Sequence, residues 1–169
     1  MIKRIFFITS LFVSIIGCSS LDFVYNNAFQ IMNKIKENTL LSISGDNRNI
    51  INSYLLNRIG KAGNNPAYAL SIVSNSVIEA TVIETDATAS KFMIKHDLKY
   101  TFNNMSKNCI TFEKNISTKN LFDAKSSGYS FGTDLAEKEL STKNLHYNID
   151  QFLNELSINH NNLKSKNEG

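Results

Sequence analysis

The sequence has 169 residues, of which 42% are hydrophobic and 20% are charged, and its formal net charge is +3. This length allows one ordinary domain with a hydrophobic core and argues against two domains. The charge is far from the dense basic surface of a dedicated nucleic-acid-binding protein, so we expect no nucleic-acid partner. Two cysteines exclude a disulfide framework and a four-thiolate zinc site.

The N-terminus has the layout of a secretory signal. Two basic residues precede an apolar run over residues 5–16, which ends at Gly17 and Cys18. A charged start, an apolar run of this length and a small residue at its end are typical of a signal peptide. The run is shorter than the roughly 20 residues of a membrane span. We predict a signal peptide over residues 1–17; the alternative is a buried N-terminal helix.

The tetrapeptide Ile15-Ile16-Gly17-Cys18 resembles the bacterial lipobox, with Ile15 at a position where Leu is commoner. The resemblance implies that Cys18 is acylated on its sulfur, becomes the new N-terminus after cleavage and is then acylated on nitrogen. One acyl chain binds a membrane only marginally, whereas several anchor a protein stably. Ser19 stands where Asp retains Gram-negative lipoproteins in the inner membrane. We therefore expect a lipid anchor on the periplasmic face of the outer membrane.

The rest of the chain divides into three parts. Residues 18–38 are weakly periodic, and we interpret them as the lipidated N-terminus and a tether. A domain is expected over residues 39–157, and the polar residues 158–169 are expected to form a disordered tail. After removal of the signal, 16 basic side chains face 15 acidic ones, so the apparent basicity belongs largely to the signal.

A strand and a helix open the predicted domain. The short apolar run Leu40–Ser44 predicts a strand that Gly45 closes. Asp46 is then placed to cap the N-terminus of a helix that ends at Gly60. Its apolar residues recur at helical spacing, and they are Ile50, Ile51, Tyr54, Leu55 and Ile59.

Three strands are predicted next. The alternation that begins at Tyr68 changes phase near Ser74–Ser76, which predicts one long strand with a bulge at that point. Residues 91–102 alternate more clearly, which predicts an antiparallel strand with one dry and one wet face. A polar loop over residues 103–108 then leads to its hairpin partner. The dry parity of residues 91–102 holds Phe92, Ile94, His96, Leu98, Tyr100 and Phe102.

A long amphipathic helix is predicted from about Phe131 to Leu156, after a Ser- and Gly-rich loop over residues 126–130. The element order is therefore strand, helix, three strands and helix. An α+β two-layer sandwich satisfies this order, with a mostly antiparallel four-stranded sheet and two helices on one of its faces.

The histidines and the second cysteine form no clear catalytic or metal pattern. His96 lies on the apolar parity of its strand, which favours a hydrogen-bonded interior residue over a ligand. We assign no metal to His146, in the second helix, or to His160, in the tail. Cys109 is expected to be a small, largely buried side chain at the start of a strand.

Three carboxylates, Glu79, Glu84 and Asp86, lie along one predicted strand and its exit, and we interpret them as solvated charges. The sequence contains no glycine-rich phosphate loop, nucleophile elbow or metal motif. We therefore expect a protein that is not an enzyme and that holds no cofactor and no metal.

Lys91, Lys95 and Lys99 are the polar feature that points most to a ligand. They lie on the wet face of the central strand, where successive lysines stand about 13 Å apart, and Asp97 lies between two of them. A solvated sheet face is one interpretation. The other is a surface for a phosphorylated ligand or an acidic partner, where lysines act as point charges.

The signal, the element order and the final helix together resemble the LptE family of lipopolysaccharide-assembly lipoproteins, over roughly residues 40–156. Residues 42–51 resemble the first strand and the entry to the first helix, best in alphaproteobacterial forms. Residues 97–102 resemble a strand with an apolar-x-Tyr-x-apolar run, and residues 127–139 resemble the approach to the C-terminal helix. The family often continues Gly-Phe-x-Pro after its acylated Cys, and residues 19–23 here do not.

The resemblance implies a plug inside the outer-membrane barrel LptD that helps to assemble the barrel and to deliver lipopolysaccharide to the outer leaflet. It also implies lipopolysaccharide binding, for which Lys91, Lys95 and Lys99 are our candidates on the basis of charge and strand parity, not of a family motif. The alternatives are a periplasmic adaptor lipoprotein that binds other envelope proteins or peptidoglycan, and a secreted enzyme with an irregular site.

Overall fold

A computed structural model of the chain describes residues 31–83, 85, 89–106, 109–123 and 130–165. The predicted signal peptide and Cys18 lie outside these residues. A short helical segment over residues 31–35 precedes the named elements. In chain order these elements are β1 (Thr39–Gly45), α3 (Arg48–Ile59), β2 (Tyr68–Ile83), β3 (Ala89–Asn104), β4 (Cys109–Asp123) and α4 (Ser130–Ser165).

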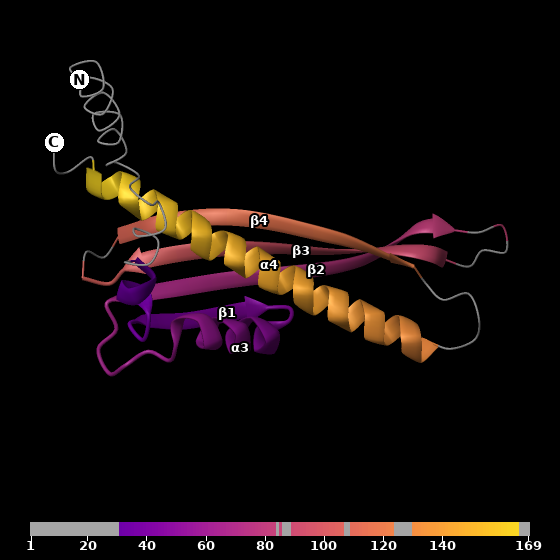
Figure 1. Ribbon diagram of the computed structural model, residues 1–169, viewed down its shortest axis with the longest axis horizontal. Helices are drawn as coiled ribbons and strands as arrows, with labels where there is room; N and C mark the ends of the chain where they lie inside the picture. The colour runs from indigo at the N-terminus through magenta and orange to yellow at the C-terminus, as the bar shows by residue number, and fades with distance from the viewer. Residues whose placement is uncertain (1–30, 84, 86–88, 107–108, 124–129, 166–169) are drawn as a thin grey trace, which may run out of the picture.

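The four strands form one sheet in the order β1-β2-β3-β4. β1 runs parallel to β2, and the other two pairings are antiparallel. Both helices pack on one face: α3 lies beside β1, and α4 crosses the strands diagonally (Figure 1). The predicted α+β two-layer sandwich is therefore confirmed. No helix among the described residues is long and apolar enough to cross a membrane.

The hydrophobic core lies between the sheet and the two helices. Burying a large aliphatic or aromatic side chain in such a core stabilises a fold by about 1.5–3 kcal/mol. The core also includes Ile31 and Ile35, so it reaches into the range expected to be a tether. Its members with no exposed surface are Ile51 and Leu55 of α3, Ile72 of β2, Tyr100 of β3, and Leu145, Ile149 and Phe152 of α4.

The turn between β1 and α3 differs from the prediction. The N-cap position is held by Asn47, which adopts a left-handed conformation and makes no side-chain cap bond. The Asp46 carboxylate instead accepts a hydrogen bond from the backbone N–H of Ser76 at 2.8 Å. The predicted cap at Asp46 is wrong because the end of β1 turns against β2. A side chain at Gly45, whose φ is +88°, would collide with the carbonyl oxygen of Ser74.

The predicted bulge at Ser74–Ser76 is also wrong. Pairing with β3 continues without a shift as far as Ala80, and the irregularities lie between Ala80 and Ile83. The apolar alternation changes phase because Ser74 and Ser76 occupy the same parity as the buried Ile72. Small polar residues therefore take helix-facing positions, and the strand stays regular.

The final helix is longer than predicted. It begins at Ser130 and continues to Ser165, well into the range that we expected to be a disordered tail. The predicted stripe is confirmed in the middle of the helix, where Leu145, Ile149 and Leu153 are buried. Residues 124–129, which hold most of the Ser- and Gly-rich loop, lie outside the described residues.

A buried hydrogen-bond network connects α4 to β3 and β4. The hydroxyl of Tyr100 donates to Asn148 Oδ1 at 2.8 Å. Asn148 Nδ2 donates to the carbonyl oxygen of Ile116 at 3.0 Å and to Thr118 Oγ1 at 3.1 Å. Burial raises the pKa of Tyr100, so its hydroxyl remains a donor at ordinary pH. Asn148 is fully buried, and its side-chain hydrogen bonds join α4 to both β3 and β4.

Replacing Asn148 with Leu should destabilise the fold by about 2–4 kcal/mol, because the Tyr100 hydroxyl and the Ile116 carbonyl would lose their side-chain partner in a buried site. Urea denaturation followed by circular dichroism measures the change. Asn154→Leu is the matched control, since Asn154 is exposed on the same helix and should change stability by no more than about 0.5 kcal/mol. Equal effects of the two variants would contradict the role assigned to the network.

Candidate functional site

The three predicted lysines lie on the face of the sheet that carries no helix. Each side chain is about half exposed, so the predicted wet face is confirmed. Each ammonium, however, has a carboxylate partner. Lys95 lies beside Asp97 and lowers the pKa of that carboxyl. The ion pairs are Lys91–Asp123 at 3.5 Å, Lys95–Asp97 at 2.8 Å and Lys99–Glu113 at 2.6 Å.

The lysine face is consequently balanced in charge. Exposed ion pairs contribute little to stability, typically about 0–1 kcal/mol each. A phosphate that approaches this face must compete with the carboxylate already beside each lysine. The geometry brings the three lysines onto one face, as the sequence predicts, and gives that face a weaker positive field than three unpaired lysines would have.

His96 is confirmed as a hydrogen-bonded interior residue. Its side chain lies between β3 and α4 and is 1% exposed. Nδ1 is 2.6 Å from the hydroxyl of Ser76 on β2, and Nε2 is 3.1 Å from the hydroxyl of Ser141 on α4. Hydroxyls donate or accept as needed, so the neutral ring is satisfied in either tautomer. Desolvation lowers the pKa of His96, against smaller opposing effects of Asp46 and Asp97.

His146 connects the two helices. Its ring stacks on Tyr54 of α3, with ring centroids 3.8 Å apart. Asp150 follows it by four residues, a spacing suited to a metal pair that the sequence interpretation overlooked. The Asp150 carboxylate instead accepts hydrogen bonds from Tyr54 at 2.7 Å and from Arg58 at 2.8 Å. Desolvation lowers the pKa of His146, and the cluster is structural.

The other candidates are either exposed or outside the described part of the chain. Glu79 is exposed, as a solvated charge should be. The side chains of Cys109 and His160, and the residues Glu84 and Asp86, lie outside the part of the chain that the structure describes. Within that part, no three His, Cys, Asp or Glu side chains are grouped as metal ligands.

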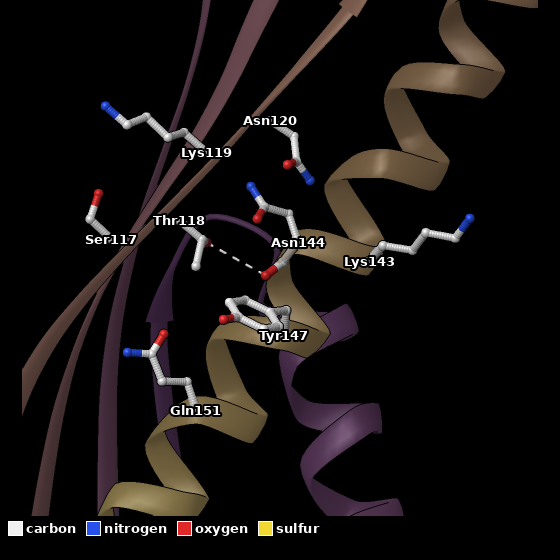
Figure 2. Close-up of a pocket in the computed structure, with 8 residues that line it drawn as sticks. All are labelled: Ser117, Thr118, Lys119, Asn120, Lys143, Asn144, Tyr147 and Gln151. Carbon is white, nitrogen blue, oxygen red and sulfur yellow. Dashed lines mark hydrogen bonds between the residues drawn. The ribbon is translucent and has the colours of Figure 1, made fainter.

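A polar groove of about 610 Å³ lies between β4 and α4, and the sequence analysis did not predict it. Asn144, Tyr147 and Gln151 contribute from α4 at spacings of three and four residues, so they form one stripe along the helix. That polar stripe beside the apolar one was the available signal. Figure 2 shows the full lining: Ser117, Thr118, Lys119, Asn120, Lys143, Asn144, Tyr147 and Gln151.

The groove follows the edge of the sheet. Four consecutive residues of β4 line it, and side chains of both parities can contact one hollow only where that hollow lies beside the strand. Thr118 is buried against α4, whereas Asn120, two residues later on the same parity, is exposed. Phe122, the next residue of this parity, is buried again beside Phe92, so the groove is a local opening between strand and helix at Asn120.

The fold is shared with solved bacterial lipoproteins. A candidate lipoprotein from Caulobacter crescentus is 10% identical, with a TM-score of 0.57 over 76% of this chain and 93% of that chain. Rare lipoprotein B from Shewanella oneidensis is 14% identical, with a TM-score of 0.52 over 75% and 98%. A minor lipoprotein from Acinetobacter baumannii is also 14% identical, with a TM-score of 0.53 over 75% and 95%.

No family model and no curated protein sequence matches the chain. At these identities the structural matches establish the fold alone, which this chain shares with these lipoproteins. They cover nearly the whole length of each matched lipoprotein, so the likeness concerns the entire domain and not a common fragment.

The buried histidines predict a loss of stability in mild acid. Because desolvation lowers the pKa of His96 in the folded protein, the unfolded chain binds a proton first as the pH falls through about 6.5. The free energy of unfolding is therefore highest above about pH 7.5 and decreases between about pH 7.5 and 5.5, by up to about 1.4 kcal/mol per pH unit for each such histidine. Urea denaturation at several pH values measures the slope.

His96→Gln should make this slope shallower, and His146→Gln should have a smaller effect because His146 is only partly buried. The pH range from about 7.5 to 5.5 lies above the range in which carboxylates titrate, so Asp97 and Glu155 do not contribute to the difference in slope between the wild type and the variants. An unchanged slope in His96→Gln would contradict the assignment.

Proposed function

We propose that this protein is an outer-membrane lipoprotein of the LptE type, which acts as plug and assembly partner of the LptD barrel in lipopolysaccharide transport. The observation that carries the proposal is the LptE-like lipoprotein fold, which covers three quarters of the chain. The lipobox-like segment that ends at Cys18 supports it from the sequence.

The surface of the domain suits such a role. The helix-free face of the sheet carries three ion pairs and is nearly balanced in charge. The lumen of a large outer-membrane barrel is polar and hydrated, so a polar, nearly charge-balanced face can lie against it with its charges still in contact with water. A lipid anchor in the same leaflet would raise the effective concentration of the domain at the barrel.

Capture of the tagged full chain from detergent-solubilised membranes of its own cells should recover an outer-membrane barrel in near-equal amount. Quantitative mass spectrometry measures the ratio. Cys18→Ser is the matched control, because loss of the anchor should reduce recovery of the barrel while the domain stays folded. Recovery of only soluble periplasmic proteins or peptidoglycan would support the adaptor alternative and overturn the LptD assignment.

The lysine face is our candidate for the phosphates of lipopolysaccharide. The Lys91/Lys95/Lys99→Ser variant should weaken binding to purified lipopolysaccharide, and the effect should diminish at high salt because screening already weakens the charges. The matched variant is Asp97→Asn, Glu113→Gln and Asp123→Asn, which leaves the lysines unpaired and should strengthen binding. Binding that is the same in the wild type and both variants would remove these lysines from the site.

A further inference from the structure

We propose that the free edge of β4 over Ser117–Asn120 binds an extended, acidic peptide segment of a partner protein, which pairs with β4 as a fifth strand beside α4. The groove between β4 and α4 and a second hollow on the opposite face of the sheet would receive its alternating side chains. The inference rests on the edge itself and does not depend on the LptD assignment.

The first observation is that β4 is an edge strand with one side open. The sheet ends at β4, which pairs with β3 along nearly its whole length of 15 residues. On the outer side of such a strand, every second residue directs its backbone N–H and C=O away from the sheet. Among the described residues, Asn148 of α4 takes one of these groups, the carbonyl oxygen of Ile116. Beyond Thr118, both Asn120 and Leu121 are exposed, and no other described strand pairs with the outer side of β4.

The second observation is a buried donor that has no partner. Asn144 is 3% exposed, and among the described residues no hydrogen bond satisfies its Nδ2. Leaving a buried polar group unsatisfied costs about 1–3 kcal/mol. Figure 2 shows its amide beside the amide of Asn120, in the space between strand and helix. A side-chain amide can both donate and accept hydrogen bonds, as a peptide group does, so Asn120 and Asn144 match the backbone of an extended peptide. Gln151 already donates to Glu155 at 3.1 Å.

The third observation is a hollow on the other face of the same strand. It has a volume of about 470 Å³ and is lined by Met93, Lys119, Asn120 and Leu121. Leu121 is 63% exposed. Side chains of an added strand alternate between the two faces of the sheet, so every second one would reach this hollow and the others would enter the polar groove. Backbone pairing with pockets for alternate side chains is the way in which peptides bind by strand addition.

The charge beside the β4 edge favours an acidic peptide. Lys119 forms no ion pair with any described residue, and no carboxylate lines either hollow. An acidic or aliphatic side chain on the helix-free face would therefore meet both Lys119 and Leu121 favourably. A second copy of this chain fits less well. A symmetric β4–β4 pair centred on Lys119 would place the two Lys119 side chains opposite each other, and their like charges would repel. Four residues of β4 span about 13 Å, enough for about four residues of the partner.

Selection from a displayed library of ten-residue peptides, with the full chain purified in detergent as the target, tests the proposal. Enriched peptides should carry Asp, Glu or aliphatic residues at alternate positions and should bind in calorimetry. Hydrogen exchange at the backbone of Ser117–Asn120 should slow when they bind. Methylation of alternate peptide nitrogens should weaken binding at least about tenfold, because it removes strand-pairing hydrogen bonds.

Two variants locate the site. Asn144→Leu should weaken peptide binding about tenfold without lowering stability, since its Nδ2 has no partner to lose. Lys119→Ser should weaken binding of acidic peptides most at low salt. Asn154→Leu and Lys138→Ser, at exposed positions of α4 outside the groove, are the matched controls and should leave binding unchanged.

Failure to enrich any peptide would overturn the proposal, as would peptides that bind wild type and Asn144→Leu equally. A concentration-dependent dimer in sedimentation that Asn144→Leu dissociates would assign the edge to a second copy instead. Purified protein and synthetic peptides are the only components, so the result is independent of whether a barrel is captured from membranes.

Discussion

The position of α4 on the sheet depends on one buried side chain. Asn148 binds Tyr100 of β3 and the Ile116 carbonyl and Thr118 hydroxyl of β4, so it fixes both the rotation and the height of the helix. A straight helix can follow a twisted sheet over only part of its length. Because α4 is held at this point, it packs closely over the core and then separates from the strands.

The composition of the interface changes where the helix separates. Leu145 and Ile149 face an apolar core, whereas Ser141, about one turn from Leu145, faces the imidazole of His96. Asn144 places a polar amide between the two. His96 then satisfies hydroxyls on both sides of the interface. Hydrogen-bonded polar groups fix the position of a helix on a sheet more precisely than aliphatic packing does. Here they fix α4 without filling the groove between α4 and β4. A continuous leucine stripe would have drawn the helix onto β4 and covered its edge.

The strands and helices of the domain were predictable because the spacing of apolar residues along a short segment decides them. The alternation of residues 91–102 and the helical spacing of Ile51, Leu55 and Ile59 survive in the structure because both patterns match a single buried face. Asp46 was not predictable, because its hydrogen bond to the Ser76 backbone depends on the register of β1 against β2.

The site was predictable only in part. Strand parity places the three lysines on one face. Two of their partners, Glu113 and Asp123, come from the neighbouring strand, and a register that depends on the hairpin decides which carboxylate meets which lysine. The groove has no local signature stronger than a polar stripe on α4, because it arises from the angle between helix and strand.

The half of the sheet that includes β2 beyond Ser74 has a second edge besides β4. β1 pairs with β2 only as far as Ser74, so the remainder of β2 is a second edge among the described strands. Isolated edges in stable monomers are usually shortened, charged or covered, whereas this half exposes Ile78, Ile83 and Leu121. Exposed apolar residues that gather at one end of a domain are typical of a surface that a partner covers. A strand added at β4 would use its outer edge and the hollow beside Leu121, and the rest of the helix-free face would remain available to a second surface. One domain can therefore hold a peptide and lie against a larger partner at the same time.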